Sequence, residues 1–144
     1  MIELLVRKGA GAIIPLDDVD MEEMARMQQG KAYKCKLTLT RNPGFHRKAF
    51  ALLRYAFSIW EGGDGRNFEH FRRQILIAAG HSDIVLNLDG TSTLEAKSIS
   101  WDAMDDTEFQ QVYDSVLNAI LRLVAVNYSA SDLNEVVDRL VRYG

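Results

Sequence analysis

Apolar residues recur three and four positions apart in five stretches of the chain, which is the spacing of one face of an α-helix. The five stretches are residues 16–29, 45–60, 67–79, 106–127 and 132–142. In the longest, the apolar stripe consists of Phe109, Val112, Tyr113, Val116, Ile120, Leu123 and Val124. The pattern therefore predicts about five helices, each turning an apolar face toward the core.

Strand patterns occur near the N-terminus and in the middle of the chain. Two short apolar runs, 2–6 and 12–14, flank a Gly-containing segment and predict two short strands that form either a hairpin or a bent edge strand. The pair Asp89-Gly90 is a strong turn signal, and it predicts a second hairpin spanning residues 83–100.

Residues 31–40 alternate with a period of two, which predicts a half-buried strand. Its inward residues would be Tyr33, Cys35, Leu37 and Leu39, and its outward residues Lys34, Lys36, Thr38 and Thr40. Cys35 is then expected to be an inert core residue. Strands and helices together predict an α+β protein, with a small, mainly antiparallel sheet packed with about five helices.

Helix boundaries are marked by capping residues. The expected N-caps are Asp17 or Asp18, Asn67, Asp105 and Ser131. Asp105 is followed three residues later by Glu108, which is the spacing of a capping box. Gly30 is the expected end of the first helix.

Length and composition indicate one domain of 144 residues, with 47% hydrophobic and 26% charged residues. A single cysteine excludes an internal disulfide. No apolar run approaches the ~20 residues of a membrane span, and the N-terminus lacks a signal-peptide pattern. We therefore expect a cytoplasmic protein that does not contact a membrane.

Charge is unevenly distributed along the chain. Residues 31–60 contain seven Lys and Arg and no Asp or Glu, whereas the whole protein has a net charge of −3. Such a block marks a docking surface for an anionic partner, or it pairs with the protein's own acidic helices. Charge alone leaves both interpretations open.

Signals for catalysis or metal binding are weak. The three histidines, His46, His70 and His81, lie outside any metal-ligand motif. The acidic residues Asp105 and Glu108 are explained by their place at a helix N-terminus. We expect a binding protein without enzymatic activity, metal or cofactor.

The basic block interleaves cations with aromatic rings, as proteins that bind single-stranded nucleic acid do. Arg47, Arg54 and Ser58 share one face of the helix expected at 45–60. Tyr55 lies nearest that face and is the candidate for stacking on a base. The candidate DNA-binding residues are Lys34, Lys36, Arg41, Arg47, Lys48, Arg54 and Tyr55.

Two segments resemble a family of uncharacterised tailed-phage and prophage proteins. The first runs from Arg41-Asn42-Pro43 through Phe45-His46-Arg47-Lys48 to Leu53. The second contains Lys97-Ser98-Ile99, Met104-Asp105 and Glu108-Phe109-Gln110-Gln111-Val112-Tyr113. The resemblance implies a phage origin and no particular activity.

The order of elements also resembles the lambda Orf (NinB) family of recombination proteins. The shared features are a basic strand, an Arg-Asn turn, an Arg-Lys helix start, a Gly-Arg loop, a hairpin and a long helix with an acidic start. The resemblance implies a homodimeric recombination mediator that binds single-stranded DNA and cooperates with host single-strand-binding protein. It implies binding through Arg41, Arg47, Lys48 and Arg54.

The apolar stripes of 106–127 and 132–142 are long for one subunit to cover, which also predicts a homodimer. An alternative function belongs to another class. The segment 101–144 has a net charge of −5 and would then be the contact surface of a protein-binding inhibitor or adaptor. Its partner would be a host defence complex or host single-strand-binding protein.

Overall fold

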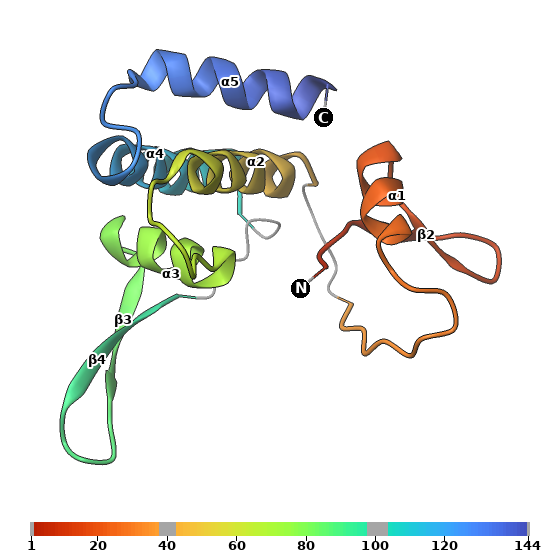
Figure 1. Ribbon diagram of the computed structural model, residues 1–144, viewed down its shortest axis with the longest axis horizontal. Helices are drawn as coiled ribbons and strands as arrows, with labels where there is room; N and C mark the ends of the chain where they lie inside the picture. The colour runs from red at the N-terminus through yellow and green to blue at the C-terminus, as the bar shows by residue number, and fades with distance from the viewer. Residues whose placement is uncertain (1, 38–42, 98–103, 144) are drawn as a thin grey trace. The chain divides into compact units, whose positions relative to one another are not determined.

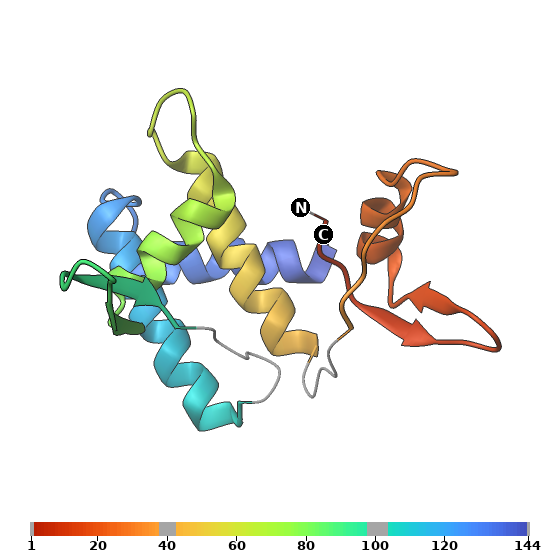
Figure 2. The ribbon, with the colours of Figure 1, turned by 90° about the horizontal axis from the view of Figure 1, so that it is seen from below.

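The computed structural model describes residues 2–37, 43–97 and 104–143. Within these ranges the chain forms five helices and two antiparallel two-stranded sheets, which confirms the α+β class (Figures 1 and 2). The chain divides into two compact units, residues 1–39 and 40–143. The single antiparallel sheet expected from the sequence is replaced, in the described part, by two separate hairpins.

The first unit contains a hairpin and a short helix. Strands β1 (Val6–Lys8) and β2 (Ile13–Pro15) pair antiparallel, so the hairpin is confirmed, although its first strand begins at the end of the expected run. Helix α1 (Asp18–Ala25) starts at the cap Asp17, whose carboxylate accepts a hydrogen bond from the Asp20 amide at 3.2 Å. The helix ends before Arg26, and not at Gly30 as expected.

Asp20 is the buried charged residue of this unit, with 3% of its surface exposed. Its carboxylate accepts a hydrogen bond from the Leu5 amide at 2.9 Å. A buried carboxylate needs such donors, because desolvation penalises an unpaired charge. The side chain therefore connects α1 to the segment that leads into β1.

The prediction of a strand at 31–40 is wrong for residues 31–37, which form no strand. The rest of that segment, residues 38–40, lies outside the described residues. Tyr33 and Leu37 are exposed at 46% and 65%, and Cys35 is exposed rather than buried. The Tyr33 hydroxyl accepts a hydrogen bond from the nearby Gln28 amide at 2.9 Å. Alternation produces a strand only where a second strand completes the backbone hydrogen bonds, and residues 31–37 pair with none of the strands that the structure describes.

The second unit buries the hydrophobic core among four helices. They are α2 (Pro43–Ile59), α3 (Phe68–Ala78), α4 (Asp106–Leu123) and α5 (Ala130–Tyr143). The most buried large side chains are Leu52 and Leu53 of α2, Leu76 of α3, Tyr113, Val116 and Ile120 of α4, and Leu133 and Val137 of α5. In the longest helix, the expected inner residues Phe109, Tyr113, Val116 and Ile120 are all buried, so helical periodicity located most of its inner face.

Three boundaries and faces differ from expectation. Helix α4 stops at Leu123, which is 54% exposed instead of lying in the core stripe, whereas Leu117 is buried at 4%. Helix α5 begins after Ser129 rather than Ser131: the Ser129 hydroxyl accepts from the Asp132 amide, and the Asp132 carboxylate accepts from the Ser129 amide, both at 3.1 Å. The Asp105 cap is confirmed, since its carboxylate accepts from the Glu108 amide at 2.8 Å.

The second hairpin, β3 (Ser82–Leu86) and β4 (Ser92–Ala96), follows α3 and extends away from the helices (Figure 1). Gly90 in its turn has φ of 85°, a left-handed conformation that glycine adopts without strain. At its base, the Lys97 amide donates to the His81 carbonyl at 2.9 Å. The turn signal Asp89-Gly90 therefore located this hairpin correctly.

Candidate nucleic-acid interface

The predicted DNA-binding residues fall on both units and partly outside the described residues. Lys34 and Lys36 are exposed on the irregular segment 31–37. Arg41 lies outside the described residues. The remaining candidates, Arg47, Lys48, Arg54 and Tyr55, lie on helix α2. The structure therefore groups the α2 residues on one element.

Helix α2 forms because its apolar positions repeat with helical spacing and its first residue, Pro43, tolerates an N-terminal position. Ala49, Leu52, Leu53 and Ala56 are buried in the core. This fixes the rotation of the helix, and Arg54 is left exposed to solvent.

Arg54 lies over an aromatic ring of the next helix. Its guanidinium carbon is 4.5 Å from the ring centroid of Phe68 on α3. Arg72 on α3 lies over Phe50 on α2 at 5.8 Å, and the two rings are 6.5 Å apart. We call Phe50, Arg54, Phe68 and Arg72 the guanidinium–ring cluster.

The cluster is reciprocal between the two helices. In sequence each arginine follows a phenylalanine by four residues, Phe50 to Arg54 and Phe68 to Arg72. In space each arginine covers the phenylalanine of the other helix. Each such contact contributes about 0.5–1 kcal/mol at an exposed site, and it orders a cation that would otherwise move freely.

The two arginines differ in their charge partners. Arg72 pairs with Glu69 at 2.7 Å, and the side chains of both are 27% exposed. The buried Arg72 Nε has no hydrogen-bond partner among the described residues. Arg54 makes no ion pair with any residue that the structure describes. In the described part of the chain, Arg72 therefore has a carboxylate partner and Arg54 has none.

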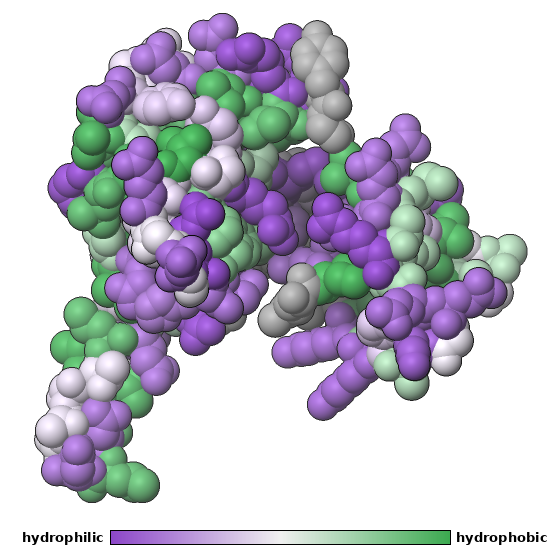
Figure 3. Space-filling model, in the orientation of Figure 1, coloured by the Kyte–Doolittle hydropathy of each residue, from purple (hydrophilic) through white to green (hydrophobic). Residues whose placement is uncertain are grey.

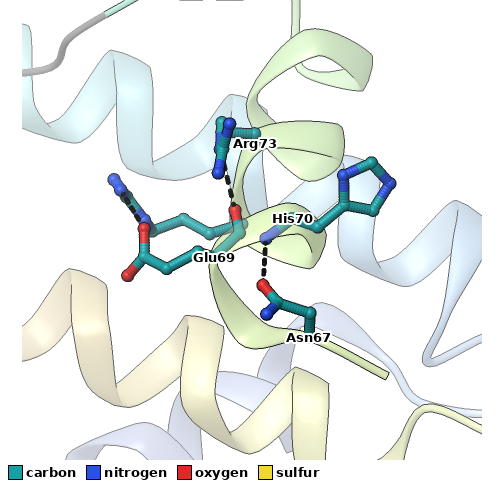
Figure 4. Close-up of polar contacts among 5 residues, drawn as sticks. Asn67, Glu69, His70 and Arg73 are labelled. Carbon is teal, nitrogen blue, oxygen red and sulfur yellow. Dashed lines mark hydrogen bonds and ion pairs between the residues drawn. The ribbon is translucent and has the colours of Figure 1, made fainter. Parts of the chain in front are cut away.

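The neighbouring turn of α3 is organised by its cap (Figure 4). Asn67 accepts a hydrogen bond from the His70 amide at 2.9 Å, which satisfies a free amide of the first turn. The Arg73 Nε donates to the Glu69 carbonyl at 3.3 Å. The second contact holds a further cation, Arg73, next to Arg72 in the sequence of α3.

Arg66 is a further cation beside an aromatic ring. Its guanidinium is 5.5 Å from the Phe57 ring centroid and donates to the Trp60 carbonyl at 2.7 Å. Sequence reasoning did not select Arg66 or Arg72 as binding residues. The four-residue spacing of Phe68 and Arg72 can be read from the sequence. The sequence does not show that α2 and α3 lie close together, and that proximity is what brings Arg72 to Phe50.

Lys48 and Tyr55 have structural contacts of their own. The Lys48 ammonium lies 4.7 Å from the ring centroid of buried Tyr113. The hydroxyls of Tyr55 and Tyr128 are 2.8 Å apart and share a hydrogen bond. That bond, followed by burial, raises the pKa of Tyr55. Tyr55 is half-buried against the core, so less of its ring is available for stacking than the sequence suggested.

Other kinds of site receive no support from the described residues. No group of three or more His, Cys, Asp or Glu side chains is placed to hold a metal ion within residues 2–37, 43–97 and 104–143. In the same ranges, no helix is both long and apolar enough to cross a membrane.

Comparison with known proteins gives one assignment. No match is found among curated proteins or among solved structures. One protein family matches residues 1–66 and 62–143, which together cover nearly the whole chain. The chain therefore belongs to the family described as "Protein of unknown function (DUF1367)".

Proposed function

We propose that this protein binds single-stranded DNA without base specificity and acts as an accessory or mediator protein in phage recombination. The observation that carries the proposal is Arg54, an exposed cation held over the Phe68 ring with no carboxylate partner in the described part of the chain. Single-stranded nucleic acid is bound by cations that contact the backbone and by planar groups that stack on bases.

The residues around Arg54 support the same function. Arg72 of the guanidinium–ring cluster, together with Arg66 and Arg73 near it in sequence, adds further cations, and Phe50 and Phe68 remain half-buried. A guanidinium is itself planar and stacks on bases as well as binding phosphate. The combination suits a flexible strand whose bases are unpaired better than a duplex whose base faces are hidden.

The test is fluorescence anisotropy with a labelled oligothymidine across a salt series. We expect binding at low salt that weakens as salt rises. For each phosphate contacted, the logarithm of the association constant should fall by ~0.7 per tenfold increase in salt concentration. The double variant Arg47→Ala/Arg54→Ala should bind at least about tenfold more weakly and show a shallower salt dependence.

A matched control removes two positive charges from two other helices. Arg122→Ala/Arg142→Ala, on α4 and α5, changes the net charge equally and should leave affinity within about threefold of wild type. The proposal is wrong if the wild type does not bind at low salt, or if both double variants lose affinity equally. The second outcome would mean that only net charge matters.

A second candidate function is a phage-encoded inhibitor or adaptor that binds a host protein through the acidic C-terminal half. The observation in its favour is that Asp114, Glu135 and Asp138 on α4 and α5 are exposed to solvent. Pull-down from a nuclease-treated host lysate tests this candidate. A stoichiometric partner that is lost when these three residues are changed to Asn or Gln favours it over DNA binding.

A further inference from the structure

The β3–β4 hairpin has one polar and one apolar face. Residues that pair directly across an antiparallel ladder lie on the same face, and successive pairs alternate. Ile84 pairs with Leu94, and Leu86 pairs with Ser92, so these residues share one face. Asp83 pairs with Glu95 and Val85 with Thr93 on the other face.

The polar face is satisfied by its own contacts. The Asn87 amide donates to the Thr91 and Thr93 hydroxyls at 2.9 and 2.7 Å. Lys97 lies 3.8 Å from the Asp83 carboxylate. Asp83 and Glu95, the charged residues of the two strands, pair directly across the ladder, so both lie on this face.

Among the residues that the structure describes, the apolar face is covered only at its base. Ala96 packs against the core of the second unit, where β4 adjoins α3. Farther out, the same face carries Ile84, Leu86 and Leu94, exposed at 76%, 73% and 52%. Leu88 in the turn is exposed at 111%, and Figure 3 shows this apolar surface in green along the hairpin and at its tip.

The exposed area is large for a single hairpin. At these exposed fractions the four residues present on the order of 600 Å², the upper end of the largest apolar patch on a typical monomer. One side of a standard protein interface buries about 800 Å². The hairpin therefore supplies most of what one side of a stable dimer interface needs.

We propose that the apolar face of the β3–β4 hairpin packs against the same face of a second copy of this chain, forming a two-fold symmetric dimer. The face carries no charged residue, so two copies meet without like-charge repulsion, and their acidic residues remain on the outer faces. The packing also extends the core of each copy, because the apolar face continues outward from Ala96.

Charge argues against nucleic acid as the occupant. Residues 82–97 contain Asp83, Asp89 and Glu95 against Lys97, a net charge of −2, which repels phosphate. The dimer does not depend on the proposed DNA binding. The sequence predicted a dimer that forms through the long helices, but their apolar stripes are largely covered within one chain. The proposed dimer forms through the hairpin instead.

The test compares two neighbouring residues of β4 on opposite faces. Leu94→Glu adds one negative charge to the apolar face, and Thr93→Glu adds the same charge to the polar face. Analytical ultracentrifugation over a range of about 1–100 μM should show a wild-type dimer in this range. We expect Leu94→Glu to raise the dimer dissociation constant at least tenfold and Thr93→Glu to leave it within about threefold.

Leu86→Glu is a second variant on the apolar face and should repeat the effect of Leu94→Glu. Circular dichroism of each variant confirms that the helical unit remains folded. A wild-type monomer at 100 μM overturns the proposal, as does a dimer that survives both substitutions. If Leu94→Glu instead abolishes oligonucleotide binding while the wild type stays monomeric, the face contacts DNA and the dimer proposal is wrong.

Discussion

The backbone of His81 connects the β3–β4 hairpin to helix α3. It lies between α3 and β3, its amide donates to the Leu76 carbonyl at 2.9 Å, and its carbonyl accepts from the Lys97 amide. Its Nε2 is buried and has no hydrogen-bond partner among the described residues. Burial, and then the nearby Lys97 charge, lower the pKa of His81 below its usual value of 6.5.

A lowered histidine pKa makes folding pH-dependent in a known direction. The unfolded chain takes up the proton near pH 6.5 and the folded chain only at lower pH, so stability falls as pH decreases below about 6.5. We expect the fall in melting temperature between pH 7.5 and 5.5 to be smaller in His81→Gln than in wild type. His70→Gln, at an exposed position, is the control and should behave as wild type. Equal losses in all three proteins would contradict the role of His81.

At the scale of elements, α4 organises the second unit, since it packs against α2, α3 and α5. Leu117 occupies the turn between Tyr113 and Ile120 and is 4% exposed, whereas Leu123 in the last turn is 54% exposed. Apolar positions spaced three and four residues apart are compatible with either Leu117 or Leu123 as an inner residue of the helix. Packing against three neighbouring helices decided which one is buried.

The same substitution at these two positions should have very different effects. Leu117→Ala removes a buried side chain and should lower the free energy of unfolding by about 2–5 kcal/mol, from lost burial and the cavity that remains. Leu123 lies on the same helix but is exposed, so Leu123→Ala should change the free energy of unfolding by less than about 1 kcal/mol. Urea denaturation followed by circular dichroism measures both. Similar losses would mean that Leu123 is also buried in solution.

At the scale of the whole molecule, apolar burial is confined to the second unit. Every buried apolar side chain identified in the structure lies between Ala49 and Val137, and residues 2–37 bury only Asp20 fully. A segment of fewer than about 40 residues rarely holds a core of its own. The sequence-based expectation of one domain therefore remains a prediction: the chain should unfold as one domain because it has a single hydrophobic core, in the second unit.

We expect one cooperative unfolding transition for the full chain, carried by residues 40–143. A truncated protein beginning at residue 40 should keep its helical circular dichroism and melt cooperatively. A synthetic peptide of residues 1–39 should show little regular structure, because two three-residue strands and one short helix bury too little surface. Two separate transitions in the full chain, or an unfolded truncated protein, would contradict this prediction.

The sequence by itself determined the features that depend on local interactions. Most of the inner face of α4 follows from helical periodicity, the caps Asn67 and Asp105 from side chains that satisfy free amides, and the hairpin turn at Gly90 from a left-handed backbone. These interactions involve residues within four positions of one another or one repeating face, so no knowledge of distant neighbours is needed.

Tertiary structure alone decided the rest. Residues 31–37 alternate like a strand but lack a partner strand, and Arg54 covers Phe68 only because α2 lies against α3. The hairpin face with Ile84 and Leu94 is exposed because the core ends at Ala96. Each of these outcomes depends on residues far apart in the chain, and a pattern of neighbouring residues carries no information about which distant surface will meet it.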